Sequence, residues 1–149
     1  MEIERKFLVD NIPYNLDQLE CHHIEQAYLC TDPVVRIRKQ DEDYYMTYKG
    51  QGLMCREEYN LPLNQEAYYH MKEKADGYII SKHRYLIPIT DNLTIELDVF
   101  QDIHSPLVLA EVEFESVSAA NTFIPPEWFV KEVTTDPRYQ NSYLSNNLL

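Results

Sequence analysis

Charged side chains alternate along the start of the chain, where single residues separate Glu2, Glu4 and Lys6. Successive side chains of a β-strand point to opposite faces, so an extended Met1–Val9 segment places two carboxylates and an ammonium on one face. Carboxylates two residues apart lie about 7 Å from each other and repel by about 2 kcal/mol at an effective dielectric of about 20. Such a face suits either open water or a site where a cation lies between the carboxylates.

The composition predicts one globular domain over residues 1–149, because 44% of the residues are hydrophobic and 12% are aromatic. The net charge of −12 argues against nucleic acid and anionic membranes as partners. No apolar run reaches membrane-spanning length and Glu2 follows the first residue, so we expect neither a membrane segment nor a signal peptide, and a cytoplasmic location. Cys21, Cys30 and Cys55 form no CxxC pair and are expected to be free thiols, and the five histidines lack zinc-ligand spacing.

Strand-like segments dominate the chain, and few segments favour helix. Asn64 is a plausible N-cap for a helix over Gln65–Ala75, and shorter helical turns are expected at Tyr14–Glu20, at Ser118–Phe123 and after Asp136. Many antiparallel strands with few helices predict an α+β protein built on a barrel or a strongly curved sheet. The predicted strands are Met1–Val9, His22–Leu29, Val34–Lys39, Tyr44–Lys49, Leu53–Leu61, Tyr78–Ile87, Leu93–Phe100 and Leu107–Glu115.

The alternation of like charges recurs along several of these strands. The pairs and triplets are Arg36 and Arg38, Lys82 and Arg84, Glu96 and Asp98, and Glu111, Glu113 and Glu115. One interpretation is a sheet with a solvated face. The other is a barrel whose charged faces point inward, with basic strands on one wall and acidic strands on the other. Arginine and lysine suit phosphate oxygens, and clustered carboxylates suit Mg²⁺ or Mn²⁺. This second interpretation favours attack of a metal-activated water on a terminal phosphorus.

The charged strands resemble, in order, the motifs of the CYTH superfamily, also called triphosphate tunnel metalloenzymes. Seven elements along nearly the whole chain carry the resemblance, together with a C-terminal segment. They are Glu2-Ile3-Glu4-Arg5-Lys6 (ExExK), Arg36-x-Arg38 (RxR), Lys49-Gly50, Arg56-Glu57-Glu58-Tyr59 (RxE[FY]E), Lys82-His83-Arg84 (KxR), Glu96-Leu97-Asp98 (ExD) and Leu109-Ala110-Glu111-Val112-Glu113 (LxExE), with Glu132-Val133-Thr134 and Tyr139-Gln140-Asn141 toward the end.

The resemblance implies an eight-stranded antiparallel β-barrel with a few peripheral helices, a triphosphate bound inside it and dependence on Mg²⁺ or Mn²⁺. It implies phosphate binding by Lys6, Arg36, Arg38, Lys49, Lys82 and Arg84. It implies metal binding, or positioning of the attacking water, by Glu2, Glu4, Glu58, Asp98, Glu111 and Glu113. The catalytic residues expected from it are Glu4, Lys82 and Glu111. Tyr28 is either an aid to the orientation of a basic side chain or an ordinary strand tyrosine.

The chain departs from the family pattern at Asn60, where the RxExE strand would carry a second carboxylate. A neutral amide lowers the negative charge of the metal-binding wall, which leaves open whether one or two ions bind. His83, between Lys82 and Arg84, is expected to face out of the tunnel.

The short chain and its opening motif look most similar to the short bacterial inorganic triphosphatases, which implies hydrolysis of tripolyphosphate, and of nucleoside triphosphates less readily. A class IV-type adenylate cyclase, a thiamine triphosphatase and a non-catalytic polyphosphate- or nucleotide-binding module remain alternatives. The expected partner is a small triphosphate, and the expected assembly is a monomer or a homodimer.

Overall fold

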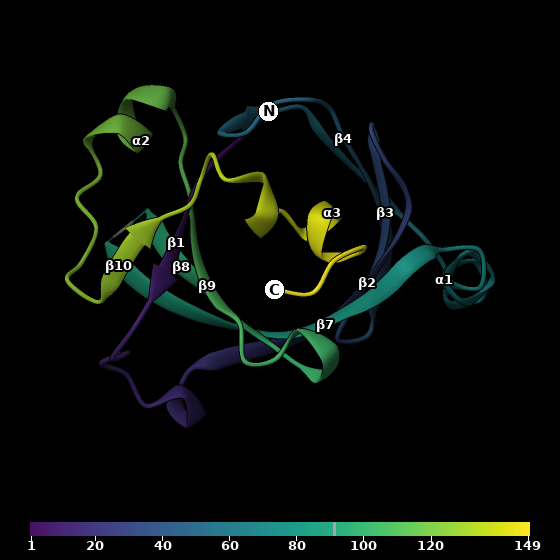
Figure 1. The fold of residues 1–149 in the computed structure, drawn as a ribbon, viewed down its shortest axis with the longest axis horizontal. Coiled ribbons are helices and arrows are strands. Elements are labelled where there is room, and N and C mark those ends of the chain that lie inside the picture. Colours follow the sequence, from purple (N-terminus) through teal and green to yellow (C-terminus); the bar gives the residue numbers. More distant parts are fainter. Residues whose placement is uncertain (91) are drawn as a thin grey trace.

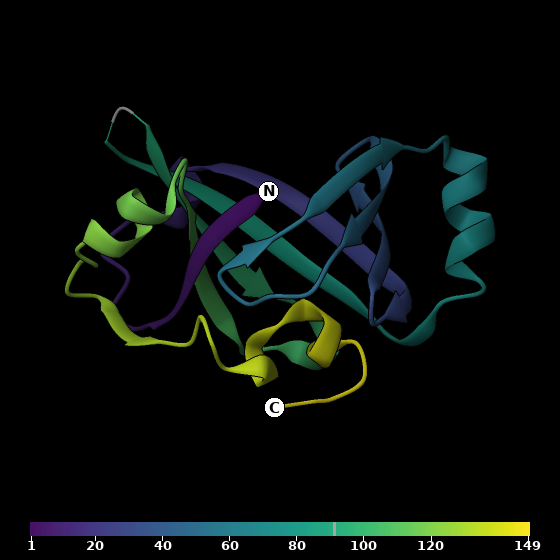
Figure 2. The same cartoon turned by 90° about the horizontal axis from the view of Figure 1, so that it is seen from above.

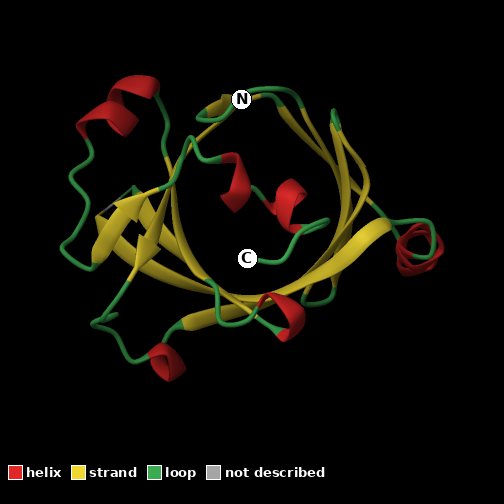
Figure 3. Ribbon diagram, in the orientation of Figure 1, coloured by secondary structure: helices red, strands yellow, loops and turns green. Residues whose placement is uncertain are grey.

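One antiparallel sheet curls into a ring that makes up most of the molecule, and the helices lie outside the ring or across its opening (Figures 1 and 3). The computed structural model describes residues 1–90 and 92–149. Its strands are β1 (Glu2–Val9), β2 (Glu20–Thr31), β3 (Val34–Gln40), β4 (Asp43–Lys49), β5 (Cys55–Arg56), β6 (Glu58–Pro62), β7 (Asp76–Thr90), β8 (Leu93–Phe100), β9 (Val108–Glu113) and β10 (Phe129–Glu132). Its helical segments are η1 (Leu16–Gln18), α1 (Gln65–Lys72), η2 (Asp102–His104), α2 (Val117–Thr122), η3 (Pro137–Tyr139) and α3 (Asn141–Leu144).

The strand order confirms the predicted antiparallel barrel, with more strands than the eight expected. In the described part of the chain the order is β10-β1-β9-β8-β7-β2-β3-β4-β6, and β5 pairs with β1. The segment predicted as one strand over Leu53–Leu61 is interrupted at Glu57. Its first part, β5, pairs with β1, and its second part, β6, pairs with β4. This single segment therefore links β4, near one end of the sheet, to β1, the strand next to the other end, and nearly closes the ring.

The apolar core lies on the outer side of the barrel wall. Phe7, Leu97 and Val112 are buried in one cluster that also contains Ala120 of α2 and Phe129 of β10. A second cluster joins the wall to α1 and consists of Ala27, Ile37 and Tyr68. Because side chains alternate along each strand, packing one face outward against these elements turns the charged face of the same strands inward.

The helices follow local signals closely where those signals are strong. Asn64 caps α1, since its side chain accepts a hydrogen bond of 2.7 Å from the backbone N–H of Ala67. The helix ends at Lys72, earlier than the predicted Ala75. The predicted Tyr14–Glu20 helix is reduced to the three residues of η1. No helix among the described residues has the length and apolar character that crossing a membrane requires.

The C-terminal segment, η3 followed by α3, lies across one opening of the ring (Figures 1 and 2). The backbone carbonyl of Tyr139 accepts a 2.9 Å hydrogen bond from Lys6 Nζ, and that of Leu144 lies 2.6 Å from His104 Nε2. Gly77 has a φ of +71°, and a β-carbon there would collide with the carbonyl of Ser145. The close approach of this segment to β7 therefore requires glycine at that position.

Candidate active site

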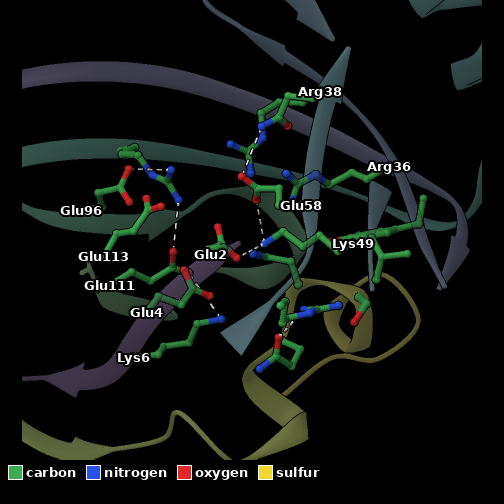
Figure 4. Close-up of a pocket in the computed structure, with 18 of the residues that line it drawn as sticks. Glu2, Glu4, Lys6, Arg36, Arg38, Lys49, Glu58, Glu96, Glu111 and Glu113 are labelled. Atoms are coloured by element: carbon green, nitrogen blue, oxygen red, sulfur yellow. Dashed lines mark hydrogen bonds and ion pairs between the residues drawn. The ribbon is translucent and has the colours of Figure 1, made fainter. Parts of the chain in front are cut away.

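The barrel interior contains a charged cavity of about 150 Å³ (Figure 4). All but two of the site residues predicted from the sequence line it, and the exceptions are Lys82 and Asp98. The predicted residues that line the cavity are Glu2, Glu4, Lys6, Arg36, Arg38, Lys49, Glu58, Arg84, Glu111 and Glu113. The inward alternation expected from the sequence therefore holds on strands from both halves of the barrel.

Neighbouring strands β1, β8 and β9 supply an acidic wall. Glu4 of β1 lies opposite Glu113 of β9, and Lys6 lies opposite Glu111. Glu96 of β8 lies opposite Glu111 on the other side. Strand pairing thus places four carboxylates and one ammonium on adjacent positions of one inner surface, where the carboxylates repel each other unless a cation joins them.

Strand β3 supplies a basic wall opposite (Figure 4). The Arg38 guanidinium is buried and donates from Nε and Nη2 to Gln26 Oε1 at 3.0 and 2.8 Å. Burial, together with the charges of Arg36 and Arg84, lowers the pKa of Arg38 below its usual range. Arg36 Nε is buried and has no hydrogen-bond partner among the residues described. Two guanidinium groups are therefore held close together with an excess of positive charge and a donor left over, which is a setting for an anion.

A buried ion-pair cluster lies between the two walls. Arg84 donates to both carboxylate oxygens of Asp98, at 2.8 and 2.9 Å, and Lys82 Nζ lies 2.7 Å from the same carboxylate. Burial alone would raise the pKa of Asp98, but Arg84 and Lys82 lower it. Burial lowers the pKa of Lys82 to about 8. Both carboxylate oxygens of Asp98 are therefore occupied, and Asp98 holds Lys82 and Arg84 in place without itself lining the cavity.

The two glutamates expected to be catalytic have opposite electrostatic environments. Glu111 lies 3.4 Å from Lys6 Nζ and 3.6 Å from Arg84 Nη2, and these cations lower its pKa despite its burial. Burial, followed by the charges of Glu111 and Glu2, raises the pKa of Glu4 to about 8. Glu4 is only 8% exposed. Lys6 and Lys49 offset only part of this repulsion, and a cation bound beside Glu4 would offset more of it and lower the pKa of Glu4.

The donor set of the acidic wall fits a hard divalent cation. Carboxylate oxygens are the ligands that Mg²⁺ and Mn²⁺ prefer, and Mg²⁺ commonly takes one or two carboxylates plus phosphate oxygens. Glu2 is held 2.8 Å from Lys49 Nζ, and Glu58 lies 3.4 Å from the same nitrogen. Lys49 already pairs with Glu2 and Glu58, and Lys6 pairs with Glu111. Because these carboxylates are partly engaged, a cation would complete its coordination with oxygens of a bound phosphate.

Asn60, the departure from the family pattern, belongs to a hydrogen-bonded chain on the cavity wall. Arg36 Nη2 donates to Thr47 Oγ1 at 3.4 Å, and the Thr47 hydroxyl donates to Asn60 Oδ1 at 2.6 Å. The Asn60 amide then donates to Glu58 Oε1 at 3.2 Å. The amide can bridge a hydroxyl and a carboxylate, whereas a second carboxylate at this position would repel Glu58.

Several cavity residues were not assigned to the site from the sequence. Glu96 lines the cavity, and its alternation with Asp98 would have identified it. Gln26 does not line the cavity but orients Arg38, and it lies in β2, a strand without a charge pattern. The lining also includes Arg56 and residues of the C-terminal segment, such as Gln140, which Arg56 Nη1 contacts at 3.3 Å. Tyr28 lines the cavity and also packs in an apolar cluster, and its role in orienting a basic side chain stays a prediction.

Known proteins similar to this chain over nearly its whole length include inorganic triphosphatases. An inorganic triphosphatase from Nitrosomonas europaea is 42% identical over 147 residues, covering 97% of this chain and 96% of the relative. An inorganic triphosphatase from Acetivibrio thermocellus is 34% identical over 150 residues, covering 98% and 94%. The crystal structure of an inorganic triphosphatase superposes with a TM-score of 0.74 at 39% identity, covering 99% of this chain and 96% of that one.

More distant structures share the fold alone. A protein from Hippeastrum, described as a putative adenylyl cyclase with a dominant triphosphatase activity, is 13% identical with a TM-score of 0.63, covering 81% of this chain and 83% of that one.

The model of the CYTH domain matches residues 1–139 of this chain. The chain therefore belongs to the CYTH domain family.

Proposed function

We propose that this protein hydrolyses inorganic tripolyphosphate to pyrophosphate and orthophosphate with the help of a divalent cation. The observation that carries the proposal is the cavity itself, in which buried guanidinium groups face a wall of carboxylates and one donor, Arg36 Nε, has no partner in the described part of the chain. The names of the two curated relatives, both inorganic triphosphatases, support the same activity.

The lining favours an inorganic chain over a nucleotide inside the cavity. Val34 is its aliphatic member, and Tyr28 and Tyr45 are its aromatic members, while the remaining residues are polar or charged. A purine would need an apolar or stacking surface, whereas phosphate oxygens need only cations and hydrogen-bond donors. A charged lining of this kind supports tripolyphosphate as the better substrate.

In this proposal the basic residues bind the phosphate oxygens. Arg36 and Arg38 present planar donors from β3, and Lys6 and Lys49 supply point charges beside Glu111 and Glu2. Arg84 lies between the walls and is fixed by Asp98. Lys82 reaches Asp98 and Asn141 and does not line the cavity, so its direct contact with substrate and its catalytic role stay predictions.

The carboxylates Glu2, Glu4, Glu58, Glu111 and Glu113 would hold the cation and orient the attacking water. Asp98, which the family resemblance also assigns to the metal, acts in our proposal as a positioning residue for Lys82 and Arg84. Mg²⁺ or Mn²⁺, when bound, supplies charge neutralisation for the phosphates and lowers the pKa of a water. Glu4 and Glu111 lie on the wall that faces the basic groups. Lys6 and Arg84 keep Glu111 ionised, so it can accept a hydrogen bond from a water, and Glu4 can do so once a bound cation offsets its raised pKa.

The test is a substrate panel in which orthophosphate and pyrophosphate are detected separately. We expect both products from tripolyphosphate with Mg²⁺ or Mn²⁺, no turnover in EDTA, and slower release from ATP and thiamine triphosphate. Binding of tripolyphosphate without turnover would overturn the proposal in favour of a binding module. Faster hydrolysis of thiamine triphosphate, or formation of cyclic AMP and pyrophosphate from ATP, would overturn the choice of substrate.

A further inference from the structure

Three potential soft-metal ligands meet on the outer face of the barrel, away from the charged cavity. His23 of β2 lies directly opposite His83 of β7, and Cys21 lies two residues before His23 on the same face. One ligand atom from each of the three side chains lies within 4.8 Å of the other two. The two imidazole rings have centroids 4.2 Å apart. Strand pairing therefore brings together residues whose spacing in the sequence gives no metal motif.

The distances suit coordination after small side-chain movements. Zinc bonds of about 2.0–2.1 Å to nitrogen and 2.3 Å to sulfur place tetrahedral ligand atoms roughly 3.3–3.7 Å apart. His23 is exposed, and Cys21 and His83 are half-buried. Rotamer changes at such positions are not resisted by a packed core, so the three atoms can close on one ion without movement of the strands.

The imidazole nitrogens are available for a ligand. In residues 1–90 and 92–149, no protein atom is hydrogen-bonded to a ring nitrogen of His23 or His83, whereas the neighbouring His22 is engaged at both nitrogens. Asp41 Oδ1 accepts the backbone N–H of His23 at 2.9 Å and fixes the strand there.

The donor chemistry distinguishes this cluster from the carboxylate wall inside the barrel. Two imidazoles and a thiolate suit Zn²⁺, while Mg²⁺ and Mn²⁺ prefer carboxylate oxygens. We propose that Cys21, His23 and His83 form a Zn²⁺ site on the outer face of the barrel, with the fourth position left to water or an external ligand. The ion would link β2 to β7, the strand that carries Lys82 and Arg84 on its opposite face.

The proposal is tested with Co²⁺ as a spectroscopic substitute for Zn²⁺, in excess Mg²⁺ to occupy the carboxylates of the cavity. Wild-type protein is expected to bind one Co²⁺ with a thiolate-to-cobalt charge-transfer band that Zn²⁺ abolishes. Cys21→Ser should lose the band. His23→Ala and His83→Ala should each weaken Co²⁺ binding by about tenfold or more, the range seen even for changes to groups that only support metal ligands.

The other two cysteines provide matched controls, since Cys30 is exposed elsewhere on β2 and Cys55 lies in β5. Cys30→Ser and Cys55→Ser should retain the band. Thermal unfolding without metal checks that each variant is folded, and Zn²⁺ should raise the Tm of wild type but not that of Cys21→Ser. Absence of the band in wild type, its persistence in Cys21→Ser or its loss in a control variant would each overturn the proposal.

Discussion

Two neighbouring residues of β3 offer a matched test of the cavity, because Arg38 points into it and Lys39 points out of it. Arg38 is buried among the cavity residues. Lys39 Nζ lies 3.4 Å from the Tyr69 hydroxyl on the outer side. Arg38→Gln and Lys39→Gln remove the same charge one residue apart, so a general effect of net charge would be the same in both variants.

The expected loss follows from the hydrogen bonds that Arg38 has left to give. Gln26 occupies Nε and Nη2, and Nη1 makes only a 3.3 Å contact with the Tyr45 hydroxyl. One charge-assisted hydrogen bond to phosphate contributes about 1.5–3 kcal/mol. In Arg38→Gln, kcat/KM for tripolyphosphate should therefore fall by about 10- to 150-fold. In Lys39→Gln it should change less than about threefold, because exposed charges are screened by solvent and salt.

Stability should change in the opposite direction from activity in Arg38→Gln. Burial, Arg36 and Arg84 lower the pKa of Arg38, which means that the empty cavity disfavours this cation. The glutamine amide at position 38 can still donate to Gln26. We expect the Tm of the ligand-free variant to equal or exceed that of wild type, and the Tm rise with tripolyphosphate to shrink. Equal losses of activity in both variants, or unfolding of Arg38→Gln, would show that Arg38 does not bind the substrate in this way.

Three further perturbations test other parts of the site and fold. Glu111→Gln removes the carboxylate that contacts Lys6 and should lower kcat at least tenfold and raise the metal concentration for half-maximal rate; an unchanged metal titration would contradict this. Asn60→Glu adds a carboxylate beside Glu58 and should lower that half-maximal concentration; no shift would make the position irrelevant to metal binding. Hydrogen bonds from Arg5 lower the folded-state pKa of Glu132 below its ordinary value. The folded state therefore binds fewer protons than the unfolded chain, and the stability that the ion pair contributes is lost as pH falls through the lowered pKa. The Tm deficit of Glu132→Gln should therefore close in acid, and a deficit constant with pH would contradict the ion pair.

The inward direction of the charged residues was predictable because a strand has only two faces. Once Phe7 and Val112 pack outward, Lys6 and Glu111 have to point inward. This alternation placed the charged residues on one face of each strand, and the resemblance to the CYTH superfamily implied that this face lines the inside of a barrel.

Features set by contacts between distant segments could not be predicted in this way. The interruption at Glu57 lies where one segment passes from pairing with β1 to pairing with β4. Strand β10 pairs with β1 near the start of the chain, and Phe129 packs on Phe7 there. The pairing of Asp98 with Lys82 and Arg84 depends on the register of β7 and β8. The outer cluster around His83 likewise depends on the register of β2 and β7, which sequence spacing does not contain.

In the proposed function, the acidic strands β1, β8 and β9 and the basic strand β3 bind a triphosphate between them inside the barrel. The most direct test is a crystal structure of the protein with tripolyphosphate and Mg²⁺ in the slowed Glu111→Gln variant. We expect phosphate oxygens within hydrogen-bond distance of Arg36 and Arg38, and a cation between the phosphates and the remaining carboxylates Glu2, Glu4 and Glu113. Tripolyphosphate bound on the outer surface of the barrel, with no phosphate inside the cavity, would contradict this proposal.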